Sequence, residues 1–232
     1  MSNGLHHKYL RTISASSQSL LHVLFPDCCS HCKVELLPNE YNLCTFCEAE
    51  LLQTYVAPLT LEFLQDYPCY IPYIFKINTP IQTLIHQLKY ASNPKIGRQL
   101  GYQIASLIST HSSPQLLVPV PLSSKRKFKR GYNQSEWICK GIQERLNIPL
   151  EGRFLKRIQD TQSQTKLRKK SREKNVDNAF ALSNKPLHPS INHIGLVDDV
   201  ITTGATLNAM VRVIKQKYPS LQITIFAAAL AQ

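Results

Sequence analysis

The stretch LVDDVITTGAT, residues 196–206, limits the choice of fold more than any other part of this 232-residue chain. An apolar run, IGLV at 194–197, precedes the two aspartates and predicts a buried strand over 191–197. After the small and hydroxyl residues, apolar side chains return at helical spacing until near Lys217. The order is therefore strand, acidic pair, small-residue loop and helix.

The same alternation of strands and helices extends through the hundred or so residues before this stretch and through the residues after it. Apolar patterns predict helices over 81–91, 96–108 and 133–146, and further strands over 115–120 and 221–230. Asn133, followed three residues later by Glu136, is typical of a helix N-terminal cap. Strands that alternate with helices predict an α/β fold with a parallel sheet flanked by helices.

The loop after the 191–197 strand is suited to a phosphate. Loops between a parallel strand and its helix lie at the carboxyl edge of the sheet, where ligands bind. Gly204 lets backbone N–H groups approach a ligand closely, and the N-terminus of the following helix favours an anion. Thr202, Thr203 and Thr206 add hydroxyl donors. The loop lacks the GK[ST] of a Walker A motif, so a nucleoside triphosphate loop is not indicated.

Asp198 and Asp199 require a different part of the ligand, because carboxylates repel phosphate at close range. They are acceptors that suit sugar hydroxyls or a divalent cation. A molecule with vicinal hydroxyls next to a phosphate is a ribose 5-phosphate. A plain capped turn would need neither both aspartates nor three threonines, so we expect a ribose-phosphate site.

Two cysteine pairs of equal spacing predict a metal-binding module near the N-terminus. They are Cys29-x2-Cys32 and Cys44-x2-Cys47, and each pair fits a tight turn that directs two thiolates at one tetrahedral Zn²⁺. Cys28 or His31 can also take the place of Cys29 at this spacing. Seven cysteines, an odd number, speak against a disulfide framework. The short span from 28 to 50 cannot build its own core, so the zinc is expected to be structural.

The chain is basic, with 27 Lys and Arg against 15 Asp and Glu, a net charge of +12. Two clusters carry much of the excess, one within 125–130 and one within 166–174. Phe128 and Tyr132 lie close to the first, which we expect to be a loop, and cations with aromatics suit single-stranded nucleic acid. A solvated charged loop or binding of pyrophosphate alone are the alternatives. The candidate nucleic-acid residues are Lys125, Arg126, Lys127, Lys129 and Arg130.

No apolar run approaches the length of about 20 residues that spans a membrane, and we expect a cytoplasmic protein. The expected organisation begins with a flexible lead-in over 1–25. A zinc module over 26–52 and a connector with short strands over 53–78 follow. The α/β domain covers 79–232.

The motif HIGLVDDVITTGAT resembles the phosphoribosyl-pyrophosphate (PRPP) motif of type I phosphoribosyltransferases. More closely, the chain is similar to the ComF family over residues 25–230. The resemblance rests on four blocks in the same order: the cysteine pairs, PVPLSSKRKFKRGYNQSE at 119–136, LKRIQDTQSQTKLRKKSREKNVDNAF at 155–180, and the PRPP motif. The additional Cys28 and the long N-terminal lead are the departures.

The resemblance implies a type I phosphoribosyltransferase-like fold behind a small zinc module. Asp198 and Asp199 would bind the ribose hydroxyls of PRPP, whose pyrophosphate would carry Mg²⁺. The 5-phosphate would contact Thr202, Thr203, Gly204, Ala205 and Thr206. The pyrophosphate would lie near Pro119, Val120, Pro121 and Leu122. A mobile loop over 156–174 would close on the site with Arg157, Gln164 and Arg172.

The resemblance also implies a role in natural competence, where incoming single-stranded DNA is handled together with other competence proteins. Two alternatives remain. One is an ordinary phosphoribosyltransferase that acts on a small base or amine. The other is a zinc-containing adaptor whose PRPP site is regulatory.

Overall fold

The computed structural model describes residues 26–55, 59–61, 64, 67–108, 113–158 and 179–231. The expected lead-in over 1–25 lies outside them. The helices are α2 (Thr45–Leu52), α3 (Pro80–Tyr90), α4 (Pro94–Ala105), α5 (Ser124–Arg130), α6 (Gln134–Leu146) and α8 (Ala205–Lys217). The strands are β1 (Leu59–Thr60), β2 (Pro68–Tyr70), β3 (Tyr73–Phe75), β4 (Leu116–Pro119), β5 (Leu155–Arg157), β6 (Phe180–Leu182), β7 (His193–Ile201) and β8 (Gln222–Ala231).

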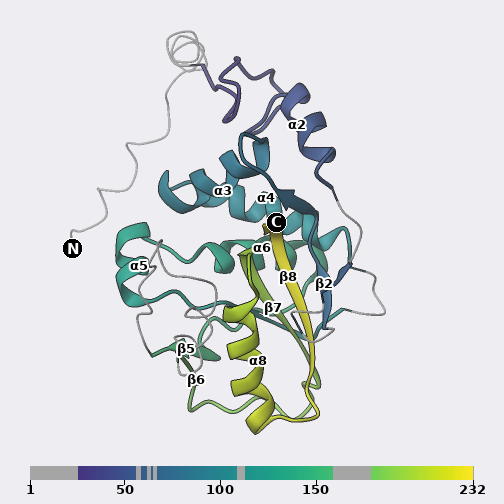
Figure 1. Ribbon diagram of the computed structural model, residues 1–232, viewed down its shortest axis with the longest axis vertical. Coiled ribbons are helices and arrows are strands. Elements are labelled where there is room, and N and C mark those ends of the chain that lie inside the picture. The colour runs from purple at the N-terminus through teal and green to yellow at the C-terminus, as the bar shows by residue number, and fades with distance from the viewer. Residues whose placement is uncertain are drawn as a thin grey trace, which may run out of the picture.

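A mostly parallel sheet forms the centre of the molecule, with β7 and β8 as its long middle strands (Figure 1). Its order is β1-β2-β8-β7-β4, and β3 also pairs with β8. Only β1 runs antiparallel to its neighbour. The short strands expected in the 53–78 connector are therefore present, and β2 and β3 extend the sheet beside β8.

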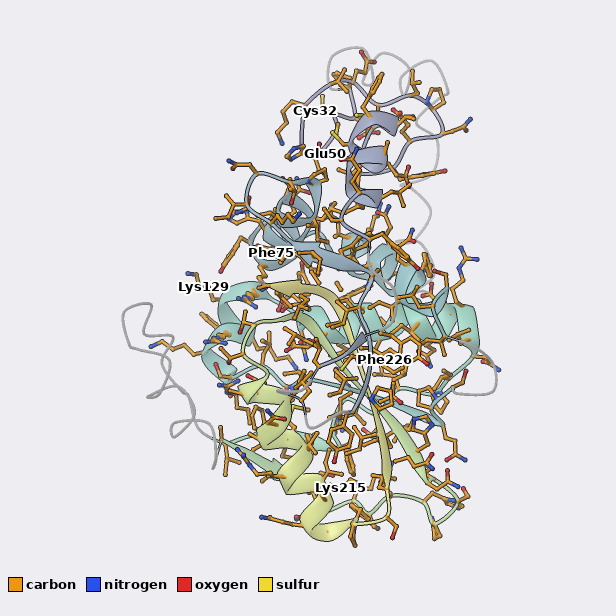
Figure 2. The ribbon with its side chains drawn as sticks, turned by 45° about the vertical axis from the view of Figure 1, so that its right-hand side comes forward. Cys32, Glu50, Phe75, Lys129, Lys215 and Phe226 are labelled. Carbon is orange, nitrogen blue, oxygen red and sulfur yellow. The ribbon has the colours of Figure 1, made fainter. Side chains whose placement is uncertain are left out.

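Helices cover both faces of this sheet because alternate residues of its strands point to opposite sides. On one face, α8 packs its apolar residues against Leu196 of β7 and Ile225 of β8. On the other, α4 and α6 pack against Val197 of β7 and Phe226 of β8, which Figure 2 labels within the body of the molecule. The predicted α/β fold with a largely parallel, helix-flanked sheet is confirmed.

The cysteine segment lies at one end of the molecule and packs on α3 and α4 (Figure 1). Ser30 donates from Oγ to Oε1 of Gln87 over 3.0 Å, and Nδ1 of His31 lies 2.8 Å from Oγ1 of Thr83. Both partners belong to α3. The module is thus joined to the α/β domain through polar contacts as well as through its buried cysteines.

Two local predictions were wrong. The strand before the acidic pair does not end at Val197, because β7 continues in register with β8 to Ile201 and carries both aspartates. The basic cluster at 125–130 is not a loop but most of the helix α5. Oγ of Ser123 accepts the N–H of Arg126 at its start, and Gly131, with φ of 78°, ends it in the left-handed conformation.

None of the helices in the described part of the chain has the length and hydropathy that crossing a bilayer requires.

Candidate functional site

The acidic pair lies near the carboxyl end of β7, where side chains from two other segments of the chain contact it. Oδ1 of Asp198 accepts the N–H of Asp199 over 2.8 Å and the hydroxyl of Ser135 over 3.3 Å. Oδ2 of Asp199 lies 3.1 Å from Nζ of Lys89. A serine from α6 and a lysine from α3 therefore hold the two carboxylates in place.

Burial raises the pKa of Asp198 to about 7, and the neighbouring charge of Asp199 contributes to the rise. The N–H of Asp199, the ammonium of Lys89 and the hydroxyl of Ser135 each oppose it. Near neutral pH the Asp198 carboxyl is thus divided between its two protonation states. A protonated carboxyl donates and a carboxylate accepts, so this group can pair with a sugar hydroxyl in either sense.

The loop between β7 and α8 forms a small pocket directly beside Asp198. Gly204 has φ of 69° and occupies the N-terminal cap position of α8, a backbone conformation that favours glycine. Thr202 is exposed, while Thr203 and Thr206 are half-buried. The pocket has a volume of about 40 Å³ and is lined by Asp198 and by residues 200–207. Hydroxyls, a helix N-terminus and a carboxyl group thus border one small cavity.

The predicted pyrophosphate segment, Pro119 to Leu122, begins at the last residue of the neighbouring strand β4. β4 pairs with β7 in parallel, with Pro119 opposite Val197, and the N–H of Val120 donates to the carbonyl of Val197 over 2.8 Å. The segment therefore leaves the sheet next to the acidic pair. Its side chains become more exposed along the chain: Pro119 and Val120 are buried, and Pro121 and Leu122 are half-buried.

Residues 132–135 connect the 119–122 segment to the acidic pair. The sequence did not indicate this connection. Nδ2 of Asn133 donates to the carbonyl of Val120 over 3.0 Å, and its Oδ1 accepts the N–H of Ser135 over 3.2 Å. The latter bond is the helix cap that the sequence predicted, and it places Ser135 under Asp198. The cap signal identified the start of α6 but not the partner of Ser135, which is 63 positions away.

The end of α3 is fixed by the same segment. The carbonyl of Leu88 accepts the hydroxyl of Tyr132 over 2.6 Å and Nε2 of Gln134 over 3.4 Å. The guanidinium of Arg130 lies 5.4 Å from the centre of the Tyr90 ring and donates to Oε1 of Gln134 over 2.9 Å. Lys89 thus occupies a helix end that is held on both sides.

The residues predicted on the mobile loop are placed only in part. Arg157 belongs to β5, which pairs with β6 in a two-stranded antiparallel sheet, and its guanidinium lies 5.2 Å from the centre of the Phe180 ring. Gln164 and Arg172 lie outside the described residues. The expectation that these three side chains face one ligand remains a prediction.

The basic helix α5 projects from the α/β domain, and Figure 2 labels Lys129 at its surface. Lys125, Lys127 and Lys129 are exposed, whereas Arg126 and Arg130 are half-buried. Phe128 is 94% exposed, the highest value among the large apolar side chains of the described residues. An exposed aromatic ring among cations has no packing role, so it is available to a partner.

The four predicted metal ligands come together: the Sγ atoms of Cys29, Cys32, Cys44 and Cys47 all lie within 4.8 Å of one another. Zinc–sulfur bonds of about 2.3 Å in a tetrahedron require sulfurs about 3.8 Å apart, so the arrangement fits one ion. Sγ of the exposed Cys28 instead donates to the carbonyl of Pro26, and the His31 ring contacts Thr83. Of the alternatives left open by spacing, the set with Cys29 is the one assembled.

The protonation of these thiols shows what the cluster would offer a cation. Burial raises the pKa of the Cys29 thiol, but N–H donors from Cys44, Cys32 and His31 together lower it to about 6. Burial and the adjacent cysteines raise the pKa of Cys47. A divalent ion among them favours the thiolate form of all four, which is the form that binds zinc.

Comparisons with known proteins point in one direction. Competence protein F of Haemophilus influenzae is 30% identical over 204 residues, which is 84% of this chain and 87% of that protein. DNA utilization protein YhgH of Salmonella typhi is 33% identical over 134 residues, or 55% of this chain and 58% of that protein. Competence protein ComFC of Bacillus subtilis is 29% identical over 155 residues, or 66% and 61%. No family model matches the chain.

Proposed function

Because this chain belongs to the ComF family, we propose that it binds PRPP together with Mg²⁺ and serves natural competence in the cytoplasm. The relatives bear the names competence protein and DNA utilization protein, which supports a role in the use of incoming DNA. The proposed role in competence rests on those relatives. The ligand rests on the chemistry of the acidic pair and its loop.

The observation that carries the proposal is the position of Asp198, which lines the small pocket formed by the loop 200–207. One ligand that presents a phosphate to the loop and hydroxyls to the aspartates satisfies both groups. A ribose 5-phosphate has this arrangement. The 119–122 segment leaves the sheet next to the acidic pair, and we assign it to the pyrophosphate at C1.

Mg²⁺ bound with PRPP would offset the charge of the pyrophosphate and help it to leave. The reaction we propose is transfer of the phosphoribosyl group. The bond between C1 and the pyrophosphate oxygen breaks, a nucleophilic acceptor forms a new bond to C1, and the acceptor's proton is released. We propose an acceptor derived from DNA, because the relatives are named for competence and for DNA utilization.

Single-stranded DNA is the second ligand that we propose, bound in part by α5. Its exposed lysines can neutralise phosphates, and the exposed Phe128 can stack on an unpaired base. The basic residues between Lys166 and Lys174 would contribute as well, although they lie outside the described residues. The zinc module, held by Cys29, Cys32, Cys44 and Cys47, supports the fold.

Calorimetric titration with PRPP, with and without Mg²⁺, tests the central proposal. Asp199→Asn keeps the shape of the side chain but turns one acceptor into a donor. A hydrogen bond to a charged group is worth about 1.5–3 kcal/mol, so PRPP affinity should fall at least about tenfold. Thr203→Val should weaken PRPP and ribose 5-phosphate alike, since it acts on the shared 5-phosphate.

The matched control is Glu48→Gln, which removes an exposed carboxylate from α2 and should leave PRPP binding unchanged. Absence of PRPP binding by the wild-type protein in Mg²⁺ would refute the proposal. A second assay measures pyrophosphate release with bases, amines and single-stranded DNA in turn. Binding of PRPP without release of pyrophosphate, whichever acceptor is added, would favour the regulatory-site alternative.

A further inference from the structure

Neither the family resemblance nor the sequence patterns assign a function to Lys89. In the structure, however, Lys89 forms an ion pair with Asp199 of the acidic pair. Its Nζ lies 3.1 Å from Oδ2 of Asp199. The two side chains are 22% and 13% exposed, so the pair is largely shielded from water but open to a ligand. An ammonium group has three N–H donors, and Asp199 accounts for one of them.

We propose that Lys89 is a pyrophosphate-binding residue, which bridges Asp199 and the pyrophosphate oxygens of PRPP. This inference rests on the proposed function and names a residue for the half of the ligand that the loop 200–207 does not contact. Two adjacent aspartates repel a pyrophosphate. A cation that already neutralises one of them removes part of that repulsion and has donors left for the anion.

The position of Lys89 is fixed by the packing and hydrogen bonds of the end of α3, which go beyond its ion pair with Asp199. It is the last residue but one of α3, whose apolar face is buried in the core. The preceding carbonyl, that of Leu88, accepts from both Tyr132 and Gln134. Because residues 132–135 also hold Val120 and Asp198, one short segment sets the spacing between Lys89, the predicted pyrophosphate segment and the acids.

Comparison of PRPP with ribose 5-phosphate separates binding from a structural role. Lys89→Met keeps the aliphatic stem and removes the charge. Loss of a charged hydrogen bond should weaken PRPP and magnesium pyrophosphate about tenfold or more. Ribose 5-phosphate, which lacks the pyrophosphate, should change less than about threefold. A structural ion pair would instead change both ribose ligands alike or neither.

Two further variants keep the test decisive. Lys89→Arg restores the charge and should recover most of the affinity for PRPP. Tyr132→Phe removes one donor from the Leu88 carbonyl and should weaken PRPP more than ribose 5-phosphate. Lys76→Met, on the exposed turn before α3, is the matched control and should bind like wild type.

Titration of wild type and Lys89→Met with magnesium pyrophosphate alone makes the two proposals distinguishable. If wild type binds pyrophosphate through Lys89 but binds no PRPP, the proposed function fails and the lysine site stands. If Lys89→Met binds pyrophosphate and PRPP as tightly as wild type does, the inference is overturned. Parallel losses of PRPP and ribose 5-phosphate in Lys89→Met would overturn it as well.

Discussion

The hydroxyl of Ser135 donates to the carboxylate of Asp198 over 3.3 Å, and this bond joins the first turn of α6 to the end of β7. Ser135 is buried, and its N–H is in turn bound by Asn133. The bond therefore has little freedom to change its geometry. Its effect on Asp198 is electrostatic, because a hydroxyl that donates to a carboxylate lowers its pKa.

Ser135→Ala should weaken PRPP binding and raise the pKa of Asp198 further. The net value of such a bond is about 0.5–1.5 kcal/mol, so the loss of affinity should lie between about twofold and tenfold. Calorimetry across pH 6–8 measures both effects. Ser124→Ala, at an exposed serine in α5, is the control. An affinity equal to that of wild type would show that the Ser135 hydroxyl has no influence on the ligand.

The stability of the unliganded protein should carry a pH-dependent contribution from Asp198. Its folded-state pKa, about 7, is raised above the ordinary value of 3.8. The folded state therefore holds this proton more tightly than the unfolded state, and the contribution declines from about pH 4 to pH 7 and is constant above. Asp198→Asn has no such proton, so it should be more stable than wild type at pH 8, by at least about 1 kcal/mol.

Urea unfolding of both proteins between pH 4.5 and 8 gives the measurement, because titrating groups that do not interact with Asp198 cancel in the difference. The difference in unfolding free energy should grow with pH and level off above 7. A difference that stays constant over the whole range contradicts the raised pKa. PRPP binding should fall in the same variant, a trade of stability against function.

Metal content should depend on the assembled cysteines and not on their neighbour. We expect about one zinc per chain in the purified protein, lost in Cys44→Ser and in Cys47→Ser. Cys28→Ser is a matched control in the same segment, and it should keep its zinc because Cys28 points to the carbonyl of Pro26. Elemental analysis decides this, and zinc that persists in Cys47→Ser would disprove the ligand set.

Binding of single-stranded DNA should depend on salt through α5. Each phosphate contact adds about −0.7 to the log–log salt slope on single strands. Changing Lys125, Arg126 and Lys127 together to alanine should flatten the slope by about two units. Three exposed lysines elsewhere, Lys76, Lys95 and Lys185, provide the control triple variant. An equal flattening in both variants would indicate general charge and not a footprint on α5.

Phe128→Ala tests the same helix without changing charge. Stacking on an aromatic side chain is worth about 1–3 kcal/mol per base, so DNA affinity should drop at least about fivefold while the salt slope stays the same. Fluorescence anisotropy with a labelled oligonucleotide measures both. Because the side chain is 94% exposed, the variant should unfold at the same temperature as wild type, which excludes loss of fold as the cause.

The central strands and helices were predictable because their patterns are local. The period-3.6 face of α8 and the apolar runs of β7 and β8 are legible without neighbours. α5 was missed because none of its residues is buried, so no apolar stripe marks it. Its ends depend on Ser123 and Gly131, and such caps carry a weaker signal than a core face.

The chemistry of the site divides in the same way. The acids and the loop threonines lie in one continuous stretch, so their combination was visible in the sequence. Lys89 and Ser135 were not, because each reaches the acids from a distant segment through tertiary packing. A lysine near a helix C-terminus and a serine in the first turn of a helix are both common for reasons of helix stability alone. Nothing in the sequence therefore marked their contacts with the aspartates.

The helix α3 touches the cysteine module with Thr83 and Gln87 and the acidic pair with Lys89. Less than two helical turns separate these contacts, a distance over which an α-helix moves almost as a rod. An ion that fastens the cysteines therefore also restricts where Lys89 can be. Thermodynamic reciprocity then applies: if bound zinc raises the affinity for a phosphorylated sugar, the bound sugar raises the affinity for zinc by the same factor. If the protein binds both ligands as proposed, removal of zinc should therefore lower its affinity for PRPP through this one helix.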